Sequence, residues 1–293
     1  MTTTNNSIAT DEQYYAKRVL SFSTVRQFAQ NPRRAYDNWT GKFPWFDNNK
    51  ALIYGSYVHA YLQDELVGGH ENVDHLKETT PDLFRKDGKL YSAYAQAEVV
   101  AQTIAGSKAF QWIVGLIGND NYEIHIEKGL TGEISGVPVK GKPDVYVVDK
   151  KRKHVYVFDF KSSASYSASG KDWITLIDGS RRYGSVAWDV AKLFPWQASV
   201  YIELLRQNGY ADYKFTSRYF VGTKQDVPRF DIWTLNSTIL AEGYAQFVSY
   251  LTLTDRYLKG ELDMPTVADD SQWYNEQTHL NGNSLIAEPL TEN

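Results

Sequence analysis

The sequence contains no cysteine among its 293 residues. This absence excludes disulfide bonds, thiolate zinc sites and cysteine-ligated iron–sulfur clusters. No apolar run approaches the roughly 20 residues that a membrane-spanning helix needs, and residues 1–13 lack the basic-then-apolar pattern of a secretory signal. We therefore expect a soluble, cytoplasmic protein that makes no use of a membrane.

An excess of positive charge is also missing. The chain carries 31 lysines and arginines against 35 acidic residues, for a formal net charge of -4. Such a balance argues against coating nucleic acid by bulk electrostatics, although a few basic side chains in one groove can still neutralise phosphates. Candidates for DNA contacts are Arg33, Arg34, Arg181, Arg182 and the basic turn 150–153, and a solvated surface remains the alternative for each.

The composition is sufficient for a large core. Hydrophobic residues make up 42% of the chain and aromatic residues 14%, and a chain of this length can form one elaborated domain. We expect a disordered or loosely docked N-terminus over 1–18, a single domain over 19–265, and a polar C-terminal tail over 266–293.

Hydrophobic periodicity predicts helices first, then antiparallel strands, and then alternating helix and strand. The Ser- and Gly-rich region 162–186 is expected to be a mobile loop, and Pro195 is expected to kink a helix or to begin a new one. This order predicts an α/β or α+β fold with a central mixed β-sheet flanked by helices. The expected helices cover 21–39, 51–67, 90–117, 186–209 and 237–258, and the expected strands lie at 121–130, around 144 and 159, and at 215–223.

The most informative segment is GKPDVYVVDKKRKHVYVFDFKSS, at residues 141–163. It places Asp144 on one strand and Asp159 on the next, beyond a predicted turn. Since alternate side chains of a strand share a face, Asp159 and Lys161 point the same way and Phe160 points to the opposite layer. Two carboxylates are oxygen ligands for Mg²⁺, and an adjacent ammonium can orient water and offset charge on phosphorus. The pattern therefore favours phosphodiester hydrolysis.

A structural explanation of this pattern is also open, because an Asp-x-Lys at a strand end is often a solvated pair. The neighbouring apolar residues Val155, Val157 and Phe158 favour an interior strand instead. Charges at the end of such a strand are costly unless they are paired or bound to metal, which favours a functional role.

The helix expected over 51–67 carries Gly55 and His59, which share one face at a spacing of four. The glycine leaves room for a group close beside the histidine. A buried histidine is usually a hydrogen-bonded core residue. With a metal already indicated by the acidic pair, His59 is also a candidate metal ligand.

These motifs together resemble the PD-(D/E)XK nuclease superfamily. The signature is Pro143-Asp144 followed by Asp159-Phe160-Lys161. The sequence is similar to the RecB-like branch in particular, which adds a Gly-x-x-x-His helix before the sheet and a Gln-x-x-x-Tyr helix after it. Within that branch it most resembles the nuclease domain of phage RecE (exonuclease VIII)-type recombination exonucleases, over about residues 20–260. The implied fold is a restriction-endonuclease-like core.

The resemblance implies a metal site for Mg²⁺, with Mn²⁺ as a substitute, and no iron–sulfur cluster. Asp144 and Asp159 would bind the cation, and His59 and the backbone carbonyl of Phe160 would complete the ligand set. Lys161 would position and activate the attacking water.

Four further residues are candidates for the surroundings of the metal site. The resemblance implies that Gln197 and Tyr201 hold the lysine or the DNA strand near the metal. Glu123 and Glu127, on the preceding strand, are candidate outer acids of the site, but we favour exposed strand residues for both.

The activity implied by the resemblance is 5′→3′ degradation of linear double-stranded DNA from its ends, leaving 3′ overhangs for recombination. It also implies a ring-shaped homo-oligomer (tetramer or trimer), a single-strand annealing partner of RecT type, and a phage- or prophage-encoded protein in the bacterial host cytoplasm. An endonuclease of restriction or repair type, or a catalytically silent DNA-binding protein, are the alternatives on the same fold.

Overall fold

The computed structural model describes residues 18–42, 50–163, 169–175, 181–187, 194–225 and 227–264. The predicted polar tail and nearly all of the predicted N-terminal segment lie outside these residues. The chain divides into two compact units, Met1–Phe22 with Asn48–Val248 and Ser23–Asp47 with Ser249–Asn293. The first unit contains every residue of the motifs described above.

A mixed five-stranded sheet forms the centre of the first unit. Its strand order is β10 (Phe230–Thr234), β9 (Lys214–Thr223), β6 (His154–Ser163), β5 (Val145–Asp149) and β2 (Tyr122–Ile126). Only β6 and β9 run parallel, and the other neighbours are antiparallel. The β-branched and aromatic residues of these strands suit a pleated, buried surface. The predicted central mixed sheet is confirmed.

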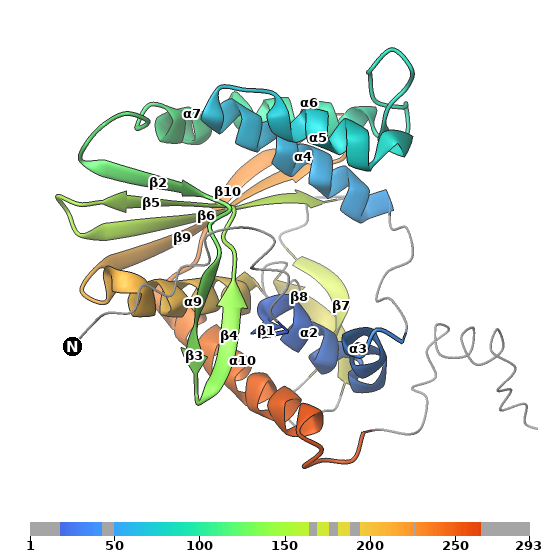
Figure 1. Ribbon diagram of the computed structural model, residues 1–293, viewed down its shortest axis with the longest axis vertical. Coiled ribbons are helices and arrows are strands. Elements are labelled where there is room, and N and C mark those ends of the chain that lie inside the picture. Colours follow the sequence, from blue (N-terminus) through green and yellow to red (C-terminus); the bar gives the residue numbers. More distant parts are fainter. Residues whose placement is uncertain are drawn as a thin grey trace, which may run out of the picture. The chain divides into compact units, whose positions relative to one another are not determined.

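Helices α4 (Lys50–Val67), α6 (Ala95–Ala105) and α7 (Lys108–Val114) cover one face of this sheet (Figure 1). Their apolar sides and the facing strand residues form one core, to which Phe158 and Phe160 contribute from β6. Two shorter elements of the same layer are α5 (Glu71–Thr79) and a 3₁₀ turn (Pro81–Leu83). Phe160 packs in this core, whereas the Lys161 ammonium lies near Phe194, so the two residues point to opposite sides of the sheet as predicted.

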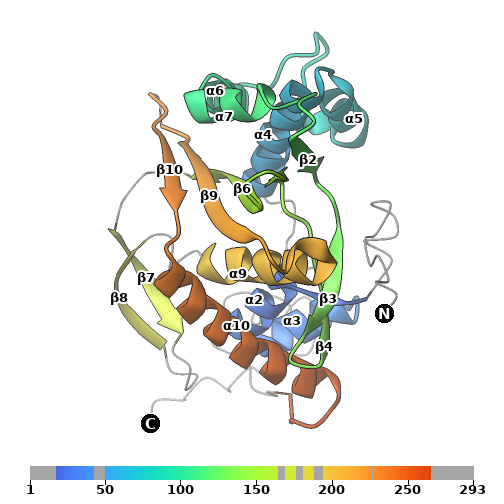
Figure 2. The ribbon, with the colours of Figure 1, turned by 90° about the vertical axis from the view of Figure 1, so that its left-hand side faces the viewer.

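Helix α9 (Phe194–Leu205) covers the other face, and Figure 2 shows it between the five-stranded sheet and the β3–β4 hairpin. Strands β3 (Leu130–Ile134) and β4 (Val137–Gly141) form a second mixed sheet with β1 (Leu20–Ser21), which pairs parallel to β4. A Cβ atom on Gly141 would lie 3.0 Å from ring atoms of Tyr201. The absence of a side chain at this position therefore lets α9 approach β4 closely.

Pro195 is the second residue of α9 as described. Residues 188–193 before it lie outside the described residues, so the choice between a kink and a new helix stays a prediction. The helix runs into a short π-helical segment, Arg206–Tyr210, where Gly209 adopts a positive φ of 104°. The prediction of a loop over 162–186 was wrong in part. Strands β7 (Ser169–Thr175) and β8 (Arg181–Ala187) pair there as an antiparallel ladder.

Two predicted helices are each divided by a capping residue. The helix expected over 21–39 is α2 (Phe22–Gln30) followed by α3 (Pro32–Trp39), because the Asn31 side chain accepts a hydrogen bond from the Arg34 N–H at 3.0 Å and a proline follows it. The helix expected over 90–117 is α6 and α7. There the Ser107 hydroxyl accepts a hydrogen bond from the Phe110 N–H at 3.2 Å.

The last described helix, α10 (Ser237–Leu258), confirms the prediction for 237–258. In the part of the chain that the structure describes, every helix is too short or too polar to cross a bilayer.

Candidate active site

The pairing of β2 with β5 brings two acidic residues together at one end of the sheet. Ile126 lies opposite Val145 in the antiparallel ladder, and the next pair along is Glu127 and Asp144. The Glu127 N–H donates a hydrogen bond of 2.9 Å to the Asp144 carbonyl. The β3–β4 hairpin, which separates these residues in sequence, pairs in another sheet.

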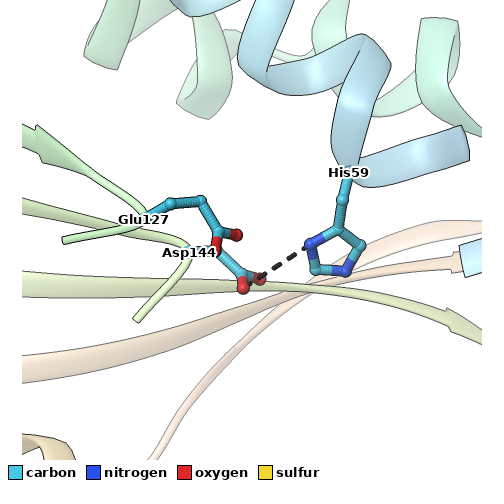
Figure 3. A group of neighbouring side chains, drawn as sticks. All are labelled: His59, Glu127 and Asp144. Carbon is cyan, nitrogen blue, oxygen red and sulfur yellow. Dashed lines mark ion pairs between the residues drawn. The ribbon is translucent and has the colours of Figure 1, made fainter. Parts of the chain in front are cut away.

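Helix α4 adds an imidazole to this pair (Figure 3). One ligand atom each from His59, Glu127 and Asp144 lie within 4.8 Å of one another. The distance from His59 Nδ1 to Asp144 Oδ1 is 3.5 Å. Low solvation and the nearby Lys161 charge lower the pKa of His59, so the neutral, metal-binding form of its ring is favoured near neutral pH.

The backbone of β6 holds the Asp144 side chain in place. The Phe160 N–H donates a hydrogen bond of 2.6 Å to Asp144 Oδ2, and the side chain is almost fully buried. Burial raises the pKa of Asp144; the Lys161 charge works against this rise, and the Glu127 charge adds to it. The site thus favours a neutral acid unless a cation compensates the carboxylate charge.

Asp159 is buried still further, with 2% of its surface exposed. Its Oδ1 forms an ion pair with the Lys161 ammonium, whereas its Oδ2 has no hydrogen-bond partner within the described residues. Burial and the Asp144 carboxylate raise its pKa, and Lys161 lowers it. A buried carboxylate oxygen without a partner is costly, so the single ammonium on Oδ1 leaves the negative charge of Asp159 incompletely compensated.

Two aromatic rings support Lys161. Its Nζ lies 5.9 Å from the ring centre of Phe194 and 6.0 Å from that of Tyr219, and these rings stack at 4.3 Å. The Tyr219 hydroxyl donates a hydrogen bond of 2.9 Å to the Phe194 carbonyl, and Tyr219 pairs with Asp159 in the β6–β9 ladder. The sequence analysis did not identify this platform, because it depends on the parallel pairing of β6 and β9.

Gln197 and Tyr201 lie on α9, one turn apart and both buried. The Gln197 amide donates a hydrogen bond of 3.0 Å to the Tyr201 hydroxyl. Burial, followed by the Asp159 carboxylate, Tyr201 and Asp144, raises the pKa of Tyr219. A direct hold on the lysine or on DNA stays a prediction for both residues.

Glu127 corrects the sequence analysis, which favoured an exposed strand residue. It is half-buried, forms an ion pair of 2.7 Å with Lys142 and accepts a hydrogen bond of 3.1 Å from the Gln63 amide. The favoured interpretation is confirmed for Glu123, which is 44% exposed and pairs with Lys150 at 3.1 Å. Glu127 follows the last residue of β2 and lies opposite Asp144. Only the β2–β5 register shows this position, so the sequence alone could not place Glu127 in the site.

The four arginines predicted to contact DNA are on α3 of the second unit and on β8. Arg33 and Arg34 are on α3, where Arg33 pairs with Asp37 at 3.3 Å. Arg181 and Arg182 begin β8, and their side chains lie outside the description. All four stay predictions.

The basic turn 150–153 follows the far end of β5, about 17 Å from Asp144 at 3.3 Å per residue. Within the turn Arg152 pairs with Asp149 at 3.6 Å, and Lys153 pairs with Asp212. These positions and pairings make the turn a solvated surface, the alternative noted for it above.

Comparison with known proteins agrees with this geometry. Residues 21–273 match the model of a family described as "PDDEXK-like domain of unknown function (DUF3799)". The chain is similar to a solved structure from Eubacterium rectale described as a "putative exonuclease", with a TM-score of 0.72 and 22% identity over 97% of this chain and 96% of that chain. At this identity the likeness shows a shared fold.

A second solved structure, described as SSO0001, aligns with a TM-score of 0.28 and 13% identity over 90% of this chain and 95% of that chain, which is too low to indicate a shared fold. The comparison with curated proteins found no match.

Proposed function

The chain belongs to the family of PDDEXK-like domains, and from this premise we propose that it is a divalent-cation-dependent deoxyribonuclease. The observation that carries the proposal is the pair of buried carboxylates, Asp144 and Asp159, one beside His59 and the other paired with Lys161. Buried charged groups lower the stability of the fold, so their presence favours a catalytic role.

The donor set fits a hard divalent cation. Asp159 Oδ2 is buried and has no hydrogen-bond partner among the described residues. The Asp144 carboxylate raises the pKa of Asp159, so two negative charges lie close together. His59, Asp144 and Glu127 form the cluster that could hold the ion, and the resemblance implies that Asp159 and the Phe160 carbonyl would add further donors. Oxygen ligands suit Mg²⁺, and the imidazole makes Mn²⁺ a good substitute. When bound, the cation supplies Lewis-acid stabilisation of charge on the phosphoryl oxygens.

The protein's own groups would prepare the attack. Lys161 can donate hydrogen bonds to a water and to a phosphate oxygen, and the Phe194 and Tyr219 rings fix its stem. The water would attack phosphorus in line with the leaving oxygen, and the ammonium would offset the charge that develops. Gln197 and Tyr201 would hold the lysine or the DNA strand from α9.

For the substrate, we propose linear double-stranded DNA, degraded 5′→3′ from its ends to leave 3′ overhangs. The resemblance to RecE-type exonucleases and the fold shared with the protein described as a putative exonuclease support this assignment. The same resemblance supports a ring-shaped homo-oligomer, a RecT-type annealing partner and a phage or prophage origin. Light scattering on the purified protein would report a trimer or tetramer if the ring proposal is correct.

The decisive experiment compares linear DNA with covalently closed circles of the same sequence, in Mg²⁺, Mn²⁺ or EDTA. We expect digestion of the linear form alone and only with a cation. Substrates labelled at either the 5′ or the 3′ end give the polarity. Nicking of the circles would contradict the exonuclease and indicate an endonuclease. Binding without hydrolysis in either cation would contradict catalysis altogether.

A further inference from the structure

A groove with a volume of about 790 Å³ opens beside the candidate active site. Three residues of the site, His59, Glu127 and Lys161, line it together with Lys142. Residues of α4 on both sides of His59 and residues of α5 also line it. The groove and the proposed catalytic centre are therefore one continuous space.

One face of α4 forms a wall of the groove. Its members are spaced three or four residues apart, as expected for a single helix face, and they are Leu52, Gly55, His59, Gln63 and Val67. Leu52 is 49% exposed and Val67 is 60% exposed. Apolar side chains thus face the open groove on both sides of the histidine.

Gly55 has no packing reason to be glycine. A Cβ atom there would meet no heavy atom of the described residues within 4 Å, whereas one on Gly141 or Gly222 would meet close neighbours. Its φ angle is not positive either. Glycine in a helix interior costs about 1 kcal/mol relative to alanine. The sequence therefore has a residue that disfavours the helix at a position that faces the groove one turn before His59.

We propose that this groove binds a single nucleic-acid strand whose sugar–phosphate backbone passes closest to the protein at Gly55. The inference rests on the proposed nuclease function and deepens it. Lys142 and Lys161 also line the groove. Each pairs with a carboxylate of the site, and an ammonium has further N–H donors that can contact a phosphate. Leu52 and Val67 offer apolar contact to sugars and bases.

The size of the groove favours a few nucleotides of one strand. Its volume falls in the range of about 300–1,000 Å³ that is typical of small-molecule pockets. A pocket of this size is too small to enclose a DNA duplex, whose major groove alone is about 12 Å wide. The occupant would therefore be a strand separated from its complement at a DNA end.

The test uses Gly55→Ala and Gly55→Leu in the full chain. We expect Gly55→Leu to weaken binding of a fluorescein-labelled single-stranded oligonucleotide at least tenfold, measured by anisotropy in EDTA, with Gly55→Ala intermediate. The thermal unfolding midpoint should stay the same or rise, because both residues favour the helix more than glycine does. Affinity for Mn²⁺, measured by calorimetry, should be unchanged.

Ala95→Leu is the matched control, since Ala95 is an exposed helical residue of α6 outside the groove. It adds similar bulk and should bind the oligonucleotide as the wild type does. Oligonucleotide affinity of Gly55→Leu within twofold of the wild type would overturn the inference, even if the wild type cuts DNA. Absence of DNA hydrolysis by the wild type would instead overturn the proposed function, so the two failures are distinguishable.

Discussion

At the residue scale, two buried aspartates of the same sheet differ in their partners. Asp159 and Asp149 are each 2% exposed. Asp149 accepts a hydrogen bond of 2.8 Å from the Arg152 N–H, whereas Asp159 has an oxygen without a partner and a second carboxylate nearby. Asp149 therefore contributes to the stability of the turn, and Asp159 lowers the stability of the metal-free fold.

Asp159→Asn should therefore have opposite effects on activity and on stability. We expect DNA hydrolysis to fall at least about 100-fold, because a metal ligand is lost. In EDTA the free energy of unfolding should rise by about 1–3 kcal/mol, because a buried charge is removed. Urea denaturation checks the second effect. Asp149→Asn is the control, with lower stability and normal hydrolysis, and wild-type activity in Asp159→Asn would contradict the assignment.

Glu127 and Glu123 offer a second comparison, on one strand and its immediate extension. Glu127→Gln should weaken Mn²⁺ binding about 10–100-fold, since a carboxylate within 4.8 Å of the His59 and Asp144 ligand atoms is lost. Glu123→Gln should bind Mn²⁺ as the wild type does, because its carboxylate pairs with Lys150 instead. Titration calorimetry measures both affinities. Equal values for the two variants would return Glu127 to a structural role.

Lys161 should affect the rate of hydrolysis more than metal binding. Lys161→Met retains a long apolar stem for the Phe194 and Tyr219 rings but removes the ammonium. We expect the turnover number to fall roughly 100-fold without loss of Mn²⁺ affinity. Lys153→Met, at an exposed pair with Asp212, serves as the control. Lost metal affinity at an unchanged rate would show that the proposed role is wrong.

At the element scale, helical spacing and strand alternation predicted the acidic strand pair and the His59 helix, whereas strand pairings distant in sequence and two helix caps were missed. The acidic pair, Lys161 and the His59 helix follow from residues a few positions apart, so alternation and helical spacing were sufficient. Glu127 could not be identified, because its position opposite Asp144 depends on β2 pairing with β5 across an inserted hairpin. The helix divisions at Asn31 and Ser107 were missed because the apolar pattern continues through both caps.

The approach of α9 to β4 gives a prediction at this scale. Gly141→Ala places a methyl group 2.9 Å from Leu204 and 3.0 Å from the Tyr201 ring, which forces the helix away from the hairpin. We expect a loss of about 1–3 kcal/mol in the free energy of unfolding, measured by urea denaturation. Gly55→Ala is the matched control and should not lose stability, because its Cβ meets no neighbour.

At the scale of the whole molecule, the cation should stabilise the folded protein. A ligand that binds only the folded state adds about 2.7 kcal/mol at a concentration 100 times its dissociation constant. For a chain of this size we expect the unfolding midpoint to rise by several degrees in Mn²⁺ relative to EDTA. Scanning calorimetry measures the rise. Asp159→Asn should show little of it, and an equal rise in both proteins would place the cation elsewhere.

The β3–β4 hairpin has a consequence for the recognition of related sequences. It leaves the five-stranded sheet after Glu127 and returns at Asp144, and its tip at Ser135 and Gly136 turns with positive φ angles. Residues added or removed at that tip would leave the ladder between β2 and β5 untouched. The interval between the two acids is therefore free to vary during evolution, and a search pattern that fixes it would overlook homologues whose chemistry is the same.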